Sequence, residues 1–436
     1  MPAAFSQQEL DAAAVDLALA PAGQRAAKAA ALRRQAADAG VHAGSIGAVY
    51  RAFAEGKLAP MTVPAMNLRG LTYLLARAVF RAVDRLDAGP VMFELAPSES
   101  DVSDQSFAEY GAQVLAAAAR EGHRGPVYLQ GDHFEVAYDS DGGHSALMER
   151  SRAAVAAGVR QIDLDAAGLA DGSAPSANER QRPNALATAH MLAFLRRLDG
   201  GDELVVGGEV GEIGGANTTP EELRTFLTAV SDALPAGMRG LDKVSVQTGT
   251  RHGGVVRKDG SVGEMSVDLE LTAILSDVAR SEFGLPGVVQ HGASTLSTAQ
   301  LAQLPDAGVI EVHLATGIQN LVFEHGALPR EFTDRINREL DSTAEIRPDD
   351  GGESASHAES GHYDAPGELS ERQRFVMNRW KAWGRYKREL WTLESGVQAS
   401  LGEAMEAWAT ELLTALQVAG KREAVGHLVV STGSRA

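Results

Sequence analysis

Short apolar runs alternate with longer amphipathic stretches from Met61 to about residue 340. The runs are rich in β-branched residues, and the 12- to 20-residue stretches between them repeat apolar residues at helical spacing. Eight such units predict a parallel sheet closed into a (β/α)₈ TIM barrel. The predicted strands are Thr62–Asn67, Pro90–Leu95, Pro126–Gly131, Gln161–Asp165, Glu203–Val210, Lys243–Thr248, Gly287–His291 and Val309–Leu314.

The chain outside this repeat is predicted to form extensions. The first part is alanine-rich with helical periodicity and holds no strand-like run, and a tract rich in Gly, Ser, Asp and Glu after the barrel is typical of a mobile loop. The expected boundaries are an N-terminal helical extension at 1–57, the barrel at 58–340, the acidic loop at 341–369 and a C-terminal helical extension at 370–436.

Composition narrows the classes of function. The 436 residues carry a formal net charge of -18, which argues against a nucleic-acid partner. The absence of cysteine excludes disulfides and thiolate chemistry. No run reaches the roughly 18 uncharged apolar residues that a membrane span needs. A cytoplasmic enzyme is therefore the default expectation.

Three histidines end apolar runs, each with glycine within two residues: His133, His252 and His291. The carboxyl ends of barrel strands meet on one face, where enzymes of this fold carry their chemistry. Three imidazoles converging there predict an open site for a divalent metal. Any one of them alone is more simply explained as a loop or core histidine.

Carboxylates accompany these histidines. Asp132 precedes His133, and since consecutive strand residues point to opposite sides, it is expected to face substrate, unless it caps the next helix. Glu209 is a candidate metal ligand or an orienter of one. Asp165 has a similar orienting interpretation, with a salt bridge at the barrel rim as the alternative. The turns after the last two strands, HGAST and Ala315–Gly317, have the backbone amides of a phosphate site.

The order of eight short motifs resembles that of class II (metal-dependent) fructose-bisphosphate aldolases, over about residues 60–340. The motifs are VPAMN, GPVMFELAPS, GDH, IDLD, GEVGEIGG, TGTRHGG, QHGAS and GVIEVHLATGIQ. The resemblance implies Zn²⁺ or another divalent metal as cofactor. It also implies a sugar phosphate as substrate, and a homodimer or larger homo-oligomer.

The resemblance also implies roles for individual residues. His133, His252 and His291 match the zinc ligands, and Glu209 matches the glutamate that can join them. Asp132 matches the acid/base group for the C4 hydroxyl. The remaining matches are Gly253, Gly292, Ser294 and Thr316 for the phosphate, Asn67 on the first strand, and Arg388, with Arg385 as a rival, for the arginine that reaches a neighbouring subunit.

Two departures from the family pattern concern substrate. The loop that carries the family's ketose-side base is shortened, which leaves Glu212 as the expected base and Glu221 or Glu222 as substitutes. The family's KxNxDT pattern reads here as EVHLAT, with His313 and Ala315 in place of its asparagine and aspartate.

The sequence therefore predicts a zinc-dependent lyase of carbohydrate metabolism, such as glycolysis. It would cleave or form a carbon–carbon bond in a fructose-1,6-bisphosphate-like ketose phosphate, with dihydroxyacetone phosphate as one half. Two alternatives stay open. One is another metal-dependent lyase or isomerase on the same scaffold, and the other is a non-catalytic, aldolase-like partner subunit.

Overall fold

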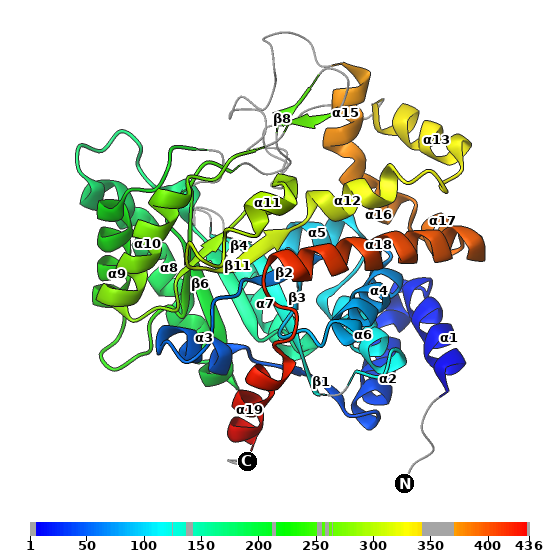
Figure 1. The fold of residues 1–436 in the computed structure, drawn as a ribbon, viewed down its shortest axis with the longest axis horizontal. Coiled ribbons are helices and arrows are strands. Elements are labelled where there is room, and N and C mark those ends of the chain that lie inside the picture. Colours follow the sequence, from blue (N-terminus) through cyan, green and yellow to red (C-terminus); the bar gives the residue numbers. More distant parts are fainter. Residues whose placement is uncertain are drawn as a thin grey trace.

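The computed structural model describes residues 6–123, 125–136, 143–211, 215–250, 255–257, 261–263, 265–341 and 370–433. Eight parallel strands close into a barrel through the pairing of β4 with β5, which confirms the predicted (β/α)₈ fold (Figure 1). All eight predicted strands are present. They are β2 (Val63–Asn67), β3 (Met92–Leu95), β4 (Gly125–Glu135), β5 (Gln161–Asp165), β6 (Val205–Glu209), β7 (Lys243–Val246), β10 (Val288–Gln290) and β11 (Val309–Leu314).

Amphipathic helices surround the barrel and bury one face against it. The helix α9 shows how the sequence sets a boundary. The hydroxyl of Thr219 accepts a hydrogen bond from the backbone N–H of Glu222, and the Glu222 carboxylate accepts one from the backbone N–H of Thr219. The helices of the barrel region are α4 (Thr72–Arg85), α5 (Pro97–Val102), α6 (Phe107–Arg120), α7 (Gly143–Ala157), α8 (Ala177–Arg196), α9 (Pro220–Ala233), α10 (Leu269–Phe283), α11 (Thr298–Leu301), α12 (Thr316–Phe323) and α13 (Arg330–Asp341). A short hairpin of β8 (Val255–Val256) and β9 (Val262–Gly263) stands apart from the barrel.

The N-terminal segment contains α1 (Gln7–Ala18), α2 (Ala22–Asp38), β1 (Val41–Gly44) and α3 (Gly47–Ala54). The prediction that it holds no strand is wrong, because β1 pairs in parallel with the first half of β4. With only four residues, β1 gives no alternation to recognise. Ile46, Val49 and Tyr50, on or beside α3, pack with the first residues of β2, β3 and β6 and so close the amino-terminal end of the barrel.

The C-terminal segment also packs on the barrel. Its long helix α18 lies across α4 (Figure 1) and buries Leu401, Met405 and Leu412. The chain after it bonds to barrel segments through Thr62 N–H to Leu416 O, at 3.0 Å. The elements are α15 (Glu371–Asn378), α16 (Ala382–Arg385), α17 (Lys387–Trp391), α18 (Ser395–Ala415) and α19 (Arg422–Gly433). Among the described residues, none of the helices combines the length and apolar character needed to cross a membrane.

Candidate metal centre

A bulge in β4 brings two predicted site residues to one side. The pairing register with β5 shifts between Gly131 and Phe134, and His133 takes the left-handed backbone conformation, with φ of 42°. As a result Asp132 and His133 both face the barrel interior, with Oδ2 of Asp132 3.7 Å from Nε2 of His133. The expectation that these neighbours point to opposite sides is therefore wrong, because it assumed a regular strand.

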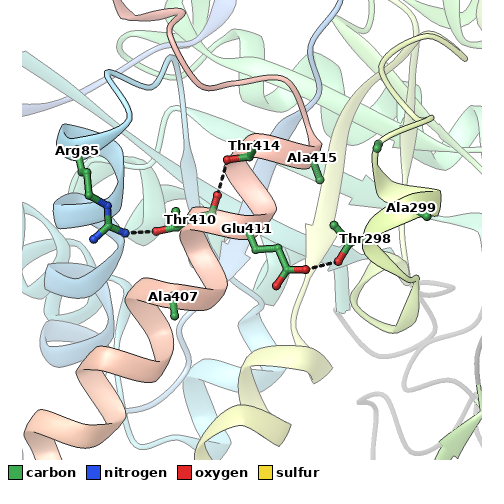
Figure 2. Close-up of a pocket in the computed structure, with 9 residues that line it drawn as sticks. Arg85, Thr298, Ala299, Ala407, Thr410, Glu411, Thr414 and Ala415 are labelled. Atoms are coloured by element: carbon green, nitrogen blue, oxygen red, sulfur yellow. Dashed lines mark hydrogen bonds between the residues drawn. The ribbon is translucent and has the colours of Figure 1, made fainter.

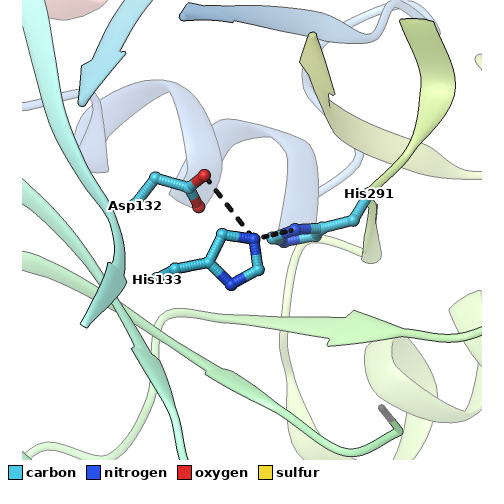
Figure 3. Close-up of side chains that lie close together, drawn as sticks. All are labelled: Asp132, His133 and His291. Atoms are coloured by element: carbon cyan, nitrogen blue, oxygen red, sulfur yellow. Dashed lines mark hydrogen bonds and ion pairs between the residues drawn. The ribbon is translucent and has the colours of Figure 1, made fainter. Parts of the chain in front are cut away.

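His133 meets His291, which follows β10 and is 1% exposed. Nε2 of His133 lies 3.1 Å from Nδ1 of His291, and the two rings meet edge to face (Figure 3). These two nitrogens and the Asp132 carboxylate lie within 4.8 Å of one another. Two imidazoles and a carboxylate at this spacing suit zinc or another divalent transition metal.

In both rings, the nitrogen that faces away from the contact between His133 and His291 contacts other polar groups. Nδ1 of His133 lies 3.3 Å from Asp165 and 3.7 Å from Oε1 of Glu209. Nε2 of His291 lies 3.0 Å from the Ser245 hydroxyl and 3.4 Å from Oε1 of Glu209. Groups on the far side of an imidazole fix its orientation and its tautomer, as around metal-binding histidines. In this arrangement Glu209 and Asp165 are placed to orient the rings.

Burial and charge act against each other at these groups. Burial raises the pKa of Glu209 well above its ordinary value. Burial acts in the same direction on Asp132, but His133 and His313 outweigh it and hold the pKa of Asp132 well below its ordinary value. Within the described part of the chain, Oε1 of Glu209 is buried without a hydrogen-bond partner. A buried acceptor next to two imidazoles is the environment that a bound cation stabilises.

His313 joins the same cluster from β11. Its Nδ1 lies 3.0 Å from Asp132 and 3.0 Å from Glu94, and its ring stacks on His291. Sequence reasoning noted His313 only as a departure from a family pattern and passed over Glu94. The available signal was a charged residue inside each otherwise apolar strand run, VMFEL and VIEVHL.

A charged layer lies next to His313 in the barrel interior. Lys243 donates to Glu311 at 2.6 Å, to Asp163 at 2.9 Å and to the side-chain oxygen of Gln130 at 2.8 Å. Burial opposes ionisation of Glu311, yet Lys243 and His313 lower its pKa to about 2. Tyr50 of α3 donates its hydroxyl to the same carboxylate. Lys243 is thus paired with carboxylates and is not a free amine.

The predicted phosphate residues lie in two adjoining turns. Gly292 is left-handed, with φ of 69°, and Ser294 accepts a hydrogen bond from the backbone N–H of Ala315 at 2.9 Å. Thr316 begins α12 one residue later. Gly253 and the third predicted histidine, His252, lie outside the described residues.

The other predicted residues take varied positions. Asn67 donates to Glu99 at 2.6 Å, and Arg388 is exposed on α17. Glu222 is committed to the cap of α9 and to an ion pair with Arg180, and Glu221 is exposed in the first turn of that helix. Glu212 lies outside the described residues.

Away from this site, a hollow of about 800 Å³ opens between α4, α11 and α18 (Figure 2). Alanines and threonines line most of it, together with Arg85 and Glu411. Glu411 accepts a hydrogen bond from Thr298 at 2.6 Å, and Arg85 bonds Thr410. None of the predicted site residues lines this hollow.

The fold and the site together define a class, that of TIM-barrel proteins with side chains that could hold a divalent metal. Comparison with known families narrows it, because the model for fructose-bisphosphate aldolase class-II matches residues 48–350. The chain belongs to the class II fructose-bisphosphate aldolase family. In sequence, no curated protein matches it.

Solved structures share the fold at low identity. The fructuronate-tagaturonate epimerase UxaE of Cohnella laeviribosi has a TM-score of 0.60 at 11% identity, with 90% of this chain and 86% of that chain covered. A fructose-bisphosphate aldolase of Campylobacter jejuni has a TM-score of 0.50 at 18% identity, with 88% and 97% covered. Identities this low show the fold and do not assign an activity.

Proposed function

We propose that this protein is a divalent-metal-dependent aldolase that cleaves or forms a carbon–carbon bond in a ketose phosphate. Dihydroxyacetone phosphate is one half of the substrate. The observation that carries the proposal is the 3.1 Å approach of His133 Nε2 to His291 Nδ1, with the Asp132 carboxylate beside them. His252 completes the proposed ligand set.

Zinc or another divalent cation at this point supplies Lewis-acid polarisation of a carbonyl and stabilises the negative charge that develops on its oxygen. Asp132 takes the proton of the hydroxyl on the carbon that becomes the aldehyde, and returns it in the reverse direction. Glu209 and Asp165 hold the imidazoles by their remote nitrogens. The helix α3 closes the amino-terminal end of the barrel. Substrate is therefore proposed to enter from the opposite face, which carries these groups.

The two adjoining turns after β10 and β11 are the proposed phosphate site. Gly292 and Ser294 come from one turn and Thr316 from the other, where the first N–H groups of α12 favour an anion. Gly253 is proposed as a further contact, and Asn67 as a contact on the first barrel strand.

The ketose-side proton requires another group. Glu212 is proposed for it, because Glu222 is already bonded within the cap of α9. Arg388 is proposed to reach the site of a neighbouring subunit, for which its exposed position on α17 is suitable. The proposal therefore includes a homodimer or larger homo-oligomer acting in the cytoplasm.

The test is a coupled assay of zinc-loaded protein against a panel of ketose mono- and bisphosphates, with Asp132→Asn as the matched control. We expect cleavage of at least one member to a triose phosphate, and its loss in the control. Turnover that is equal in the two proteins would overturn the role of Asp132. Bound metal with no reaction across the panel would instead support the non-catalytic partner subunit.

A second candidate is an isomerase that cleaves the same bond and re-forms it on the opposite face of the aldehyde. It is favoured by His313, which stands where the family has asparagine and lies 3.0 Å from Asp132. Asp132 and His313 are two ionisable groups side by side. Such a pair suits a bond-forming step in which either face of the aldehyde is attacked and a proton is needed on either side. Fructuronate therefore belongs in the panel, and an epimeric product without net cleavage would select the isomerase.

A further inference from the structure

Three buried side chains converge on a second point, next to the proposed histidine site. Glu94 of β3, Asp132 of β4 and His313 of β11 are 0%, 5% and 4% exposed, and their ligand atoms lie within 4.8 Å of one another. His313 Nδ1 is 3.0 Å from Oε2 of Glu94 and 3.0 Å from Oδ1 of Asp132. The other oxygen of Glu94 has no hydrogen-bond partner among the described residues, although it is fully buried.

The network around His313 determines which of its nitrogens carries the proton. A lysine amine only donates, so Lys243 fixes the oxygen of Gln130 toward itself and the amide NH₂ toward Glu311. Lys243 also holds Glu311 ionised, and Nε2 of His313 therefore donates to this carboxylate at 2.7 Å. An imidazole that donates one N–H to a carboxylate presents its second nitrogen as a metal ligand.

The second nitrogen of His313 then faces two carboxylates, an arrangement that a cation between them stabilises. A proton on Nδ1 provides one charge and bonds well to only one of the two oxygens. A divalent ion provides two charges and accepts all three donors, and it lies beside the carboxylate whose Oε1 has no hydrogen-bond partner among the described residues. Donors about 3 Å apart are also the neighbours expected around an ion with metal–oxygen distances of about 2.1 Å.

The balance of buried charge points the same way. Six carboxylates gather around Lys243 and the histidines, and a divalent ion lowers the cost of burying such groups in their ionised form. The six carboxylates that line this part of the barrel are Glu94, Asp132, Asp163, Asp165, Glu209 and Glu311.

We propose that Glu94, Asp132 and His313 bind a second divalent cation, distinct from the ion at His133 and His291. Two carboxylates and one imidazole suit Mn²⁺, Fe²⁺ or Zn²⁺. Asp132 presents Oδ1 to this site, while its Oδ2 faces His133 and stays free for proton transfer, so the two ions are neighbours on either side of one carboxylate. The second ion fixes Asp132 beside the histidines and offsets part of the negative charge of the barrel interior.

The test counts metal ions and does not depend on turnover. Full-length protein is stripped with a chelator, dialysed against Mn²⁺ and analysed for bound manganese per chain. We expect two ions in the unaltered protein and one in Glu94→Gln or His313→Asn. His133→Ala is expected to retain one ion, held at the second site. The control His427→Asn, on a side chain that is 78% exposed, is expected to keep two.

One ion in the unaltered protein, or two in Glu94→Gln, would overturn the proposal. A second measurement does not need a variant to fold, because two Mn²⁺ ions on either side of one carboxylate are close enough to give the electron paramagnetic resonance spectrum of a coupled pair. A spectrum of isolated Mn²⁺ at full loading would overturn the pair of neighbouring sites. The count also separates this proposal from the proposed activity, since the protein can bind two ions without acting on any ketose phosphate.

Discussion

His313 lies flat against His291, with ring centroids 4.0 Å apart and ring planes inclined by 19°. The contact joins His313, where the sequence departs from the family pattern, to His291, a proposed metal ligand. A position that departs from the family pattern therefore lies directly beside a position that matches it. Changes at His313 are therefore expected to affect metal binding and substrate choice together.

Removal of either facing histidine is expected to empty the histidine site. His133→Ala and His291→Ala should each lower bound divalent metal by one ion per chain and abolish turnover, because each removes one of few protein ligands. His252→Ala is predicted to do the same. Metal analysis of the purified variants checks this, with His357→Ala and His362→Ala, in the acidic segment, as controls. A histidine whose loss leaves the count unchanged has been assigned wrongly.

Asp132→Asn is expected to keep the ion at the histidines while kcat falls by about 10² to 10⁴, the usual effect of losing a general acid/base group. KM should change much less, because asparagine keeps the shape of the side chain. Steady-state kinetics with parallel metal analysis would separate the outcomes. Loss of the histidine-bound ion together with activity would show that Asp132 serves mainly as a ligand.

Lys243→Met is expected to destabilise the fold by about 3–5 kcal/mol, since it leaves the buried carboxylates of Asp163 and Glu311 without their cation. Urea unfolding measures the free energy of unfolding. The control is Lys28→Met, which removes an exposed pair with Asp16 and should cost about 0–1 kcal/mol. Equal losses in the two variants would show that the buried network contributes no more than a surface pair.

Leu412→Ala tests whether the C-terminal segment belongs to the folded unit. Leu412 is 3% exposed on α18, the helix that packs on α4, so its truncation should cost about 2–5 kcal/mol. Leu186→Ala, at a side chain that is 44% exposed, should cost far less. A single cooperative transition shifted by Leu412→Ala is expected. An unchanged transition would mean that α18 folds separately from the barrel.

The order of elements could be predicted from the sequence because each strand is a local apolar run and each helix has a local period. The meeting of His133 and His291 could be predicted for the same reason, since the carboxyl ends of parallel strands must meet on one face of a barrel. The elements that local pattern did not reveal are short, such as β1, which exists only because β4 offers it a free edge.

Only the tertiary structure decided which side chains share a site. Asp132 and His133 turn to the same side because β4 has a bulge, which depends on its pairing with β5. The strands that carry Glu94, Lys243 and Glu311 are far apart in the chain. In the sequence, each of these residues is only an isolated charge in an apolar run. When the barrel closes, these charged side chains come within hydrogen-bond distance of their partners. They are buried there, so each must be paired. The local sequence pattern contains no information about these pairs.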